Sequence, residues 1–138
     1  MNLQPRIALS FDGRCEAAFR FYERALNGKI AFLLHWGESP TAKDAPEEWR
    51  SKVYHATLNV GDTSLSGGDV LPESYKSPQG FSIQLNMTDA SDSERVFHAL
   101  AEGGTVCMPL QQTFWAARFG VVTDQFGIQW DINCEKSE

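Results

Sequence analysis

The sequence predicts one α+β domain that is built from two copies of the same βαβββ unit. The chain has 138 residues, which is the usual size of a single domain. Each half begins with an alternating strand, continues with an amphipathic helix that stops at glycine, and ends with three further strands. An offset of 76 residues aligns the halves, with identities at Ile7/Ile83, Leu9/Leu85, Phe21/Phe97, Ala25/Ala101 and Gly28/Gly104. These identities follow the strand, the helix and the helix stop, which indicates an internal duplication.

The first copy spans about residues 5–68. Residues 6–11 alternate large apolar and small side chains, as a half-buried strand does. An amphipathic helix follows, and Asn27-Gly28 supplies the left-handed residue that ends it. The polar segment 37–52 is expected to be a loop because it contains two prolines and many charged residues. The other strands of this copy are expected at 29–36, 53–60 and 63–66.

A linker at 69–79 leads to the second copy, about residues 80–135. Residues 81–87 alternate as the first strand does. The second helix is expected to begin with a capping box between Ser91 and Glu94. The remaining strands are expected at 105–108, with Pro109 as the stop, and at 117–123 and 128–133.

Composition narrows the class of function and the cellular location. The net charge of −6 and the absence of a basic cluster argue against nucleic acid as a partner and favour neutral or cationic ligands. No apolar run approaches the roughly 20 residues of a membrane helix, and the N-terminus does not read as a secretory signal. We therefore expect a cytoplasmic protein with no membrane partner. Three cysteines, at spacings typical of neither a zinc site nor a redox motif, predict reduced thiols.

Two segments carry a family resemblance. Residues 9–22 read Leu-Ser-Phe-Asp-Gly-Arg-Cys-Glu-Ala-Ala-Phe-Arg-Phe-Tyr, and residues 112–130 contain Thr-Phe-Trp and Asp-x-Phe-Gly-x-x-Trp. With His55-Ala56 and the Ser-Gly-Gly-Asp at 66–69, they resemble PhnB-like proteins of the vicinal oxygen chelate (glyoxalase/bleomycin resistance/dioxygenase) superfamily. The resemblance implies two modules that each curve a sheet around one side of a cup, in a homodimer that binds a small molecule.

The resemblance also makes a divalent metal ion a candidate cofactor. In metal-using relatives, His, Glu or Gln side chains of both modules bind one ion, which acts as a Lewis acid on the substrate. Asp131 falls at the position of the last ligand, where glutamate is typical. The first strand offers only Ile7, Ala8 and Leu9 where relatives carry a histidine or glutamate. The usual ligand set is therefore incomplete.

Strand alternation predicts which side chains line the cup. The polar face of the second copy is expected to bind the ligand through Ser82, Gln84, Asn86 and Gln129, beside Asp131 as the candidate metal ligand. His55 lies in the middle of a strand and is the candidate catalytic residue, as a general base or a metal ligand. The alternative is a histidine that packs on a cross-strand neighbour or at the dimer interface.

Two further residues are candidates for ligand binding. Trp115 belongs to an aromatic cluster that either clamps a flat ligand or packs the core and dimer. Arg118, among these aromatics, needs a ligand anion or a carboxylate such as Asp69 or Asp124. Cys15, near a helix start, is interpreted as a packing residue.

Two functions are compatible with these residues. One is a metal-assisted enzyme acting on a small oxygenated substrate, with Asp131, Gln84 and His55 as candidate ligands or bases. The alternative is a non-catalytic small-molecule-binding protein of the bleomycin-resistance type, without a metal. Methyl transfer is disfavoured because the sequence lacks a glycine-rich loop, after a buried parallel strand, to hold S-adenosylmethionine.

Overall fold

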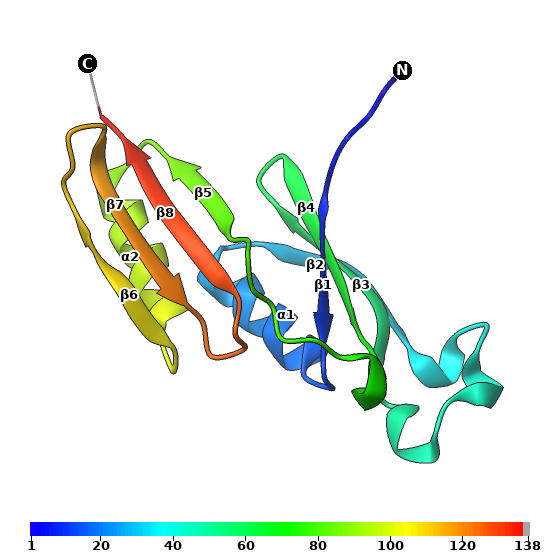
Figure 1. Cartoon of the computed structure of the whole chain (residues 1–138). Coiled ribbons are helices and arrows are strands. Elements are labelled where there is room, and N and C mark those ends of the chain that lie inside the picture. Colours follow the sequence, from blue (N-terminus) through cyan, green and yellow to red (C-terminus); the bar gives the residue numbers. More distant parts are fainter. Residues whose placement is uncertain (137–138) are drawn as a thin grey trace. The chain divides into compact units, whose positions relative to one another are not determined.

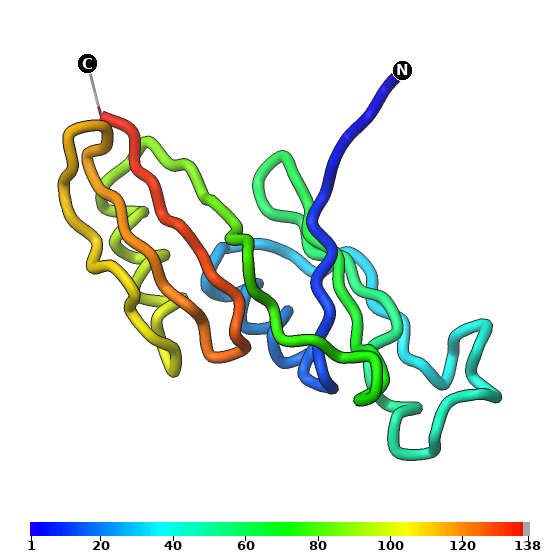
Figure 2. Tube along the Cα trace, viewed as in Figure 1, coloured from blue at the N-terminus to red at the C-terminus, as the bar shows by residue number. Residues whose placement is uncertain are grey.

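The computed structural model describes residues 1–136, and the chain divides into two compact units, Met1–Lys76 and the remainder from Ser77. In each unit one helix packs against one face of a four-stranded sheet (Figure 1). The chain trace passes through the same order of elements in both units (Figure 2). Within residues 1–136, no helix has the length and apolar character needed to cross a membrane.

The two sheets have matching topologies. The first unit consists of β1 (Ile7–Phe11), α1 (Cys15–Ala25), β2 (Lys29–His35), β3 (Val53–Val60) and β4 (Thr63–Asp69). The second consists of β5 (Ile83–Met87), α2 (Ala90–Ala101), β6 (Thr105–Gln111), β7 (Ala116–Thr123) and β8 (Gln129–Glu135). The strand orders are β1-β4-β3-β2 and β5-β8-β7-β6, and in both only the first pair is parallel. The predicted pair of βαβββ units is confirmed.

Each helix places a phenylalanine ring on a strand glycine. A Cβ at Gly67 of β4 would lie 2.9 Å from the Phe19 ring of α1, and one at Gly120 of β7 would lie 2.7 Å from the Phe97 ring of α2. Both rings are buried. The two units therefore use the same close helix-to-sheet contact, which a side chain on either glycine would disrupt.

Several element boundaries differ by one to three residues from the sequence expectation, among them those of α2, β6 and β4. Helix α2 begins earlier, because Asp89 is its N-cap and accepts a hydrogen bond from the backbone N–H of Asp92 at 2.9 Å, so Ser91 lies inside the helix. Strand β6 continues through Pro109, since it is an edge strand whose pairing register shifts at that point. Strand β4 extends to Asp69.

The segment between β2 and β3 folds into three short 3₁₀ turns, η1 (Trp36–Glu38), η2 (Ala42–Asp44) and η3 (Glu47–Trp49). The indole Nε1–H of Trp36 donates to the carbonyl of Asp69 at 2.9 Å, and Trp49 is buried. At the start of the segment, the His35 ring lies 3.1 Å from Glu38 and 3.3 Å from Glu16 of α1. These contacts hold the loop against both β4 and α1.

A single buried carboxylate joins three parts of the first unit. Oδ1 of Asp69 accepts hydrogen bonds from the backbone N–H groups of Gly13 at 2.8 Å and Cys15 at 2.9 Å, and Oδ2 accepts one from Val53 at 2.9 Å. Asp69 is 3% exposed. The carboxylate therefore takes the place of a side-chain cap for α1, whose N-cap residue Arg14 makes no such bond.

Replacing Asp69 with alanine is expected to lower the free energy of unfolding by about 3 kcal/mol, because two buried N–H groups and one partly buried N–H group lose their acceptor. Urea denaturation followed by circular dichroism measures the change. Asp62→Ala, in the exposed β3–β4 turn, is the matched control and should cost little. Equal effects of the two substitutions would contradict the role given to Asp69.

The contact at His35 is expected to weaken as the pH rises. Partial desolvation acts to lower the pKa of His35, but hydrogen bonds with Glu38 and Glu16 outweigh it and hold the pKa above its ordinary 6.5. The backbone N–H and then the ring of His35 hold the pKa of Glu38 below its ordinary 4.5. The stabilising contributions of His35 and Glu38 are thus both fully present between pH 4.5 and 6.5. The contribution of His35 is lost as the pH rises through its pKa, and that of Glu38 is lost as the pH falls through its pKa.

Hydrogen exchange tests this dependence. After correction for intrinsic rates, amides of residues 37–52 should exchange more slowly at about pH 5.5 than at about pH 8. His35→Gln should remove the difference between the two pH values. A pH response that survives this substitution would show that another group controls the loop.

Candidate functional site

Six polar side chains of the neighbouring strands β5 and β8, linked by hydrogen bonds, lie on the face of the second sheet that α2 does not cover, and we call them the polar row. They come from β5 with its preceding residue and from β8: Ser82, Gln84, Asn86, Gln129, Asp131 and Asn133. The parallel register places Gln84 beside Asp131 and Asn86 beside Asn133. The alternate residues Trp130 and Ile132 are fully buried on the other face of the sheet.

Hydrogen bonds connect the polar row into two groups of three. Asp131 accepts from the hydroxyl of Ser82 at 2.8 Å and from the amide of Gln129 at 3.3 Å. Oδ1 of Asn86 accepts from the amide nitrogen of Gln84 at 3.0 Å and from that of Asn133 at 3.2 Å. The side chains therefore hold one another in position before any ligand arrives. The structure thus brings together five residues that the sequence indicates as candidates, the four polar ones and Asp131.

Asn133 is the member of the polar row that the sequence reasoning missed. It lies two residues after Asp131, so the alternation that predicts the other five also covers this position. Its Oδ1 is buried and, within residues 1–136, accepts no hydrogen bond. An unpaired buried acceptor costs about 1–3 kcal/mol, and solvent does not reach this oxygen, so a ligand can bond to it only after the Asn133 side chain turns.

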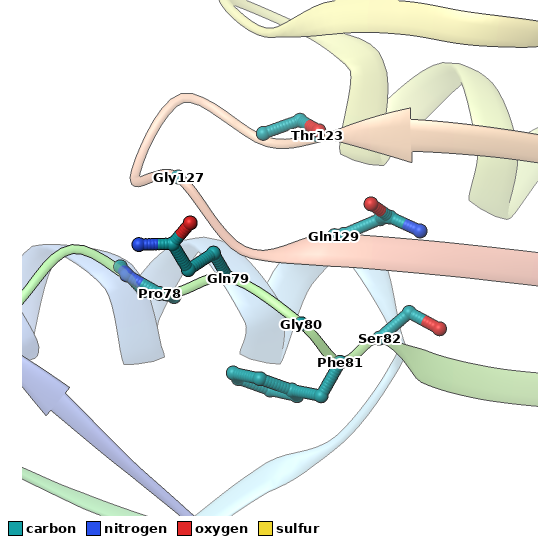
Figure 3. A pocket seen from close by; sticks show the side chains of 8 residues that line it. All are labelled: Pro78, Gln79, Gly80, Phe81, Ser82, Thr123, Gly127 and Gln129. Carbon is teal, nitrogen blue, oxygen red and sulfur yellow. The ribbon is translucent and has the colours of Figure 1, made fainter.

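A cavity of about 490 Å³ opens at one end of the polar row. It is lined by Pro78, Gln79, Gly80, Phe81, Ser82, Thr123, Gly127 and Gln129. Figure 3 shows the side chains of Ser82, Thr123 and Gln129 on neighbouring segments around it. Since two of these residues hydrogen-bond to Asp131, the cavity and the polar row form one continuous site.

Exposed aromatic side chains lie at the other end of the row. Phe119 of β7 is paired with Asn133 in the sheet, so both face the same side. The ring of Trp115 is 5.4 Å from that of Phe119 and 4.8 Å from that of Phe114, measured between centroids. Trp115 is 50% exposed and Phe114 87% exposed. Trp115 therefore stands at the surface, where an apolar part of a ligand can reach it.

The structure does not bring Arg118 into the polar row. Its Nε donates to Glu94 of α2 at 3.2 Å, and its pairing position in the sheet is Cys134, which is buried. The guanidinium thus belongs to the side of the sheet that α2 covers. The expected carboxylate partners are engaged elsewhere: Asp69 binds backbone N–H groups, and Asp124 accepts from two backbone N–H groups and the indole of Trp130.

His55 lies on the sheet of the first unit. It is exposed, its ring is 5.9 Å from that of Phe32 on the neighbouring strand, and its Nε2 is 3.5 Å from the hydroxyl of Thr57. It borders a hollow of about 320 Å³ together with Ser10 and Tyr54. In the described part of the chain no carboxylate bonds to its ring, so the catalytic role stays a prediction.

The side chains around Asp131 do not fit a divalent transition metal. Within residues 1–136, no three His, Cys, Asp or Glu side chains gather closely enough to hold an ion. The immediate partners of Asp131 are a hydroxyl and an amide, and each of its oxygens already accepts a hydrogen bond. Such a donor set lacks the imidazole and the further carboxylates on which these metals depend.

The three cysteines are free thiols in different surroundings. Cys15 and Cys134 are buried, whereas Cys107 is exposed, with its Sγ 3.4 Å from the hydroxyl of Thr123. Burial, reinforced by the charges of Asp69 and Glu16, raises the pKa of the Cys15 thiol far above its ordinary value. Cys15 is therefore a packing residue held in its neutral form.

The chain thus has a duplicated βαβββ architecture, and the sheet of its second unit has a polar face with a cavity beside it. The chain belongs to the Glyoxalase/Bleomycin resistance protein/Dioxygenase superfamily, whose family model matches residues 6–132.

Individual relatives agree with this assignment. Protein YjdN from Escherichia coli is 33% identical over 138 residues, which cover 94% of each chain. The crystal structure of protein PA1353 from Pseudomonas aeruginosa superimposes with a TM-score of 0.89 at 44% identity, covering 99% of this chain and all of that one. The PhnB protein from Bacillus cereus has the same fold, with a TM-score of 0.80 at 22% identity over 96% of this chain and 99% of that one.

Thiol titration provides a test of the cysteine environments. In the folded protein at neutral pH, an aromatic disulfide reagent should modify Cys107 quickly, and the other two thiols only after denaturation. Absorbance of the released thiolate counts the reactive groups, and Cys107→Ser should abolish the fast phase. Rapid modification of Cys15 in the folded state would contradict the burial described above.

Proposed function

We propose that this protein binds a small molecule on the polar row and the adjoining cavity, and that it does so without a metal ion. The observation that carries the proposal is the hydrogen-bonded arrangement of the row. Six side chains present hydroxyl, amide and carboxylate groups on a rigid strand pair, with amides and not metal-binding side chains around Asp131. Pre-positioned polar groups beside a concave surface are typical of small-molecule sites.

The two ends of the row support a ligand that is polar at one end and apolar or flat at the other. The cavity end offers hydrogen-bonding groups together with the half-exposed ring of Phe81. The other end offers Trp115 and Phe119, which suit an apolar or flat part of the ligand. Binding proteins of the bleomycin-resistance type within the superfamily are the precedent for this function.

A metal-assisted reaction on a small oxygenated substrate is the second candidate. Asp131 favours it, because this carboxylate stands where the resemblance places the last metal ligand. His55 would be its general base. The incomplete set of donors around Asp131 counts against it.

The homodimer and the cytoplasmic location predicted from the sequence are parts of the proposal. Three free thiols suit a reducing compartment. The exposed apolar side chains of the edge strand β6, Val106 and Met108, are compatible with an interface between subunits.

Metal titration separates the two candidates. Protein treated with a chelator and then titrated with Zn²⁺, Mn²⁺ or Ni²⁺ in a calorimeter is expected to show no stoichiometric binding, because Asp131 lacks partner ligands. Asp131→Ala and the control Asp92→Ala, on α2, are titrated in parallel. One equivalent of metal that is lost in the first variant and kept in the second would overturn metal-free binding.

A further inference from the structure

We propose that the ligand of the polar row carries a protonated amine together with several hydroxyl or N–H donors, as an amino sugar does. This inference rests on the proposed function and names the chemical class that the same site selects. It follows from the charge of the row, from its excess of acceptors and from the spacing of its two main binding positions.

Charge is the first argument. Asp131 is the single ionisable side chain of the polar row, and its hydrogen-bond partners, Ser82 and Gln129, are neutral. No cation pairs with it within residues 1–136, since Arg118, the basic residue of β7, is paired with Glu94 on the other side of the sheet. A partly buried carboxylate without a counter-charge attracts a cation and repels an anionic ligand.

The number of hydrogen-bond acceptors that are open to a ligand is the second argument. Gln84 and Gln129 use their amide nitrogens inside the row, which leaves both carbonyl oxygens open to a ligand. A carboxylate has about four lone-pair positions, and Asp131 uses two of them. These open lone pairs outnumber the amide N–H groups that the row leaves unused, and the strongest acceptor among them is the charged Asp131. An ammonium group, with three donors and no acceptor, complements it.

Spacing is the third argument. Asp131 and Gln129 are alternate residues of β8, so their side chains emerge on one face roughly 7 Å apart, and the carbonyl oxygen of the exposed Gln129 is free to accept. A ligand that binds both needs an ammonium at Asp131 and another donor at about that distance. A hexose-sized ring with several hydroxyl groups meets this requirement, and the adjoining cavity offers room for a substituent.

Three sugars that share one ring and differ in charge test the class of ligand. Glucosamine, glucose and glucuronate are titrated at millimolar concentrations and slightly acidic pH, with ¹⁵N-labelled protein monitored by NMR. Glucosamine is expected to bind about tenfold more tightly than glucose, as a charge-assisted hydrogen bond predicts, and glucuronate more weakly than glucose. The side-chain amide signal of Gln129, which donates to Asp131, should move on addition of glucosamine.

Two substitutions test whether Asp131 is the origin of the preference for the amine. Asp131→Asn keeps the shape of the side chain and removes its charge, and should bring glucosamine and glucose to similar affinity. Asp92→Asn makes the same chemical change on α2, which covers the opposite face of the sheet, and should leave the preference for the amine unchanged. Circular dichroism confirms that both variants are folded.

The possible outcomes distinguish failure of the amine class from failure of metal-free binding. Glucose or glucuronate binding as tightly as glucosamine, or a preference that survives Asp131→Asn, overturns the amine class while leaving metal-free binding intact. Absence of binding by all three sugars overturns it as well. Failure of the proposed function would appear separately, as stoichiometric metal binding that depends on Asp131.

Discussion

The site depends on a buried carboxylate in the turn between β7 and β8. Asp124, which is 3% exposed, accepts hydrogen bonds from the backbone N–H groups of Phe126 and Ile128 and from the indole of Trp130. These bonds fix the conformation of the turn and determine which side chains of the following strand, β8, face the core. With Trp130 held in the core, alternation sends Gln129 and Asp131 to the uncovered face. The first unit contains a comparable device in Asp69, which joins β4, the start of α1 and the start of β3.

Much of this arrangement could be predicted from the sequence because it depends on periodicity. Alternation identified the two strands of the polar row, and the repeat at a constant offset indicated the duplicated topology. Arg118 shows the limit of this reasoning. A register shift between Ala116 and Arg118 disturbs the simple alternation of β7, and the guanidinium binds Glu94 of a helix that lies far away in sequence.

Other differences also arise from non-local contacts. The strand β6 accommodates Pro109 because an edge strand with shifted register does not need that N–H for pairing. The unpaired, buried acceptor of Asn133 cannot be predicted from its sequence position alone, because the amide nitrogen of this side chain donates to Asn86 on the neighbouring strand. Sequence patterns place residues on a face, whereas the partners of each side chain follow from tertiary structure.

The parallel pairing of β1 with β4 and of β5 with β8 has a consequence for how the chain folds. Ile7 pairs with Leu65, and Ile83 with Trp130, so the strand that opens each unit stays without its neighbour until the last strand of that unit has formed. Non-local pairing of this kind slows folding. During synthesis, however, the first unit has all its strands once Asp69 has left the ribosome, and can form its core before the second unit has emerged. The duplication therefore divides one slow search into two successive, shorter ones.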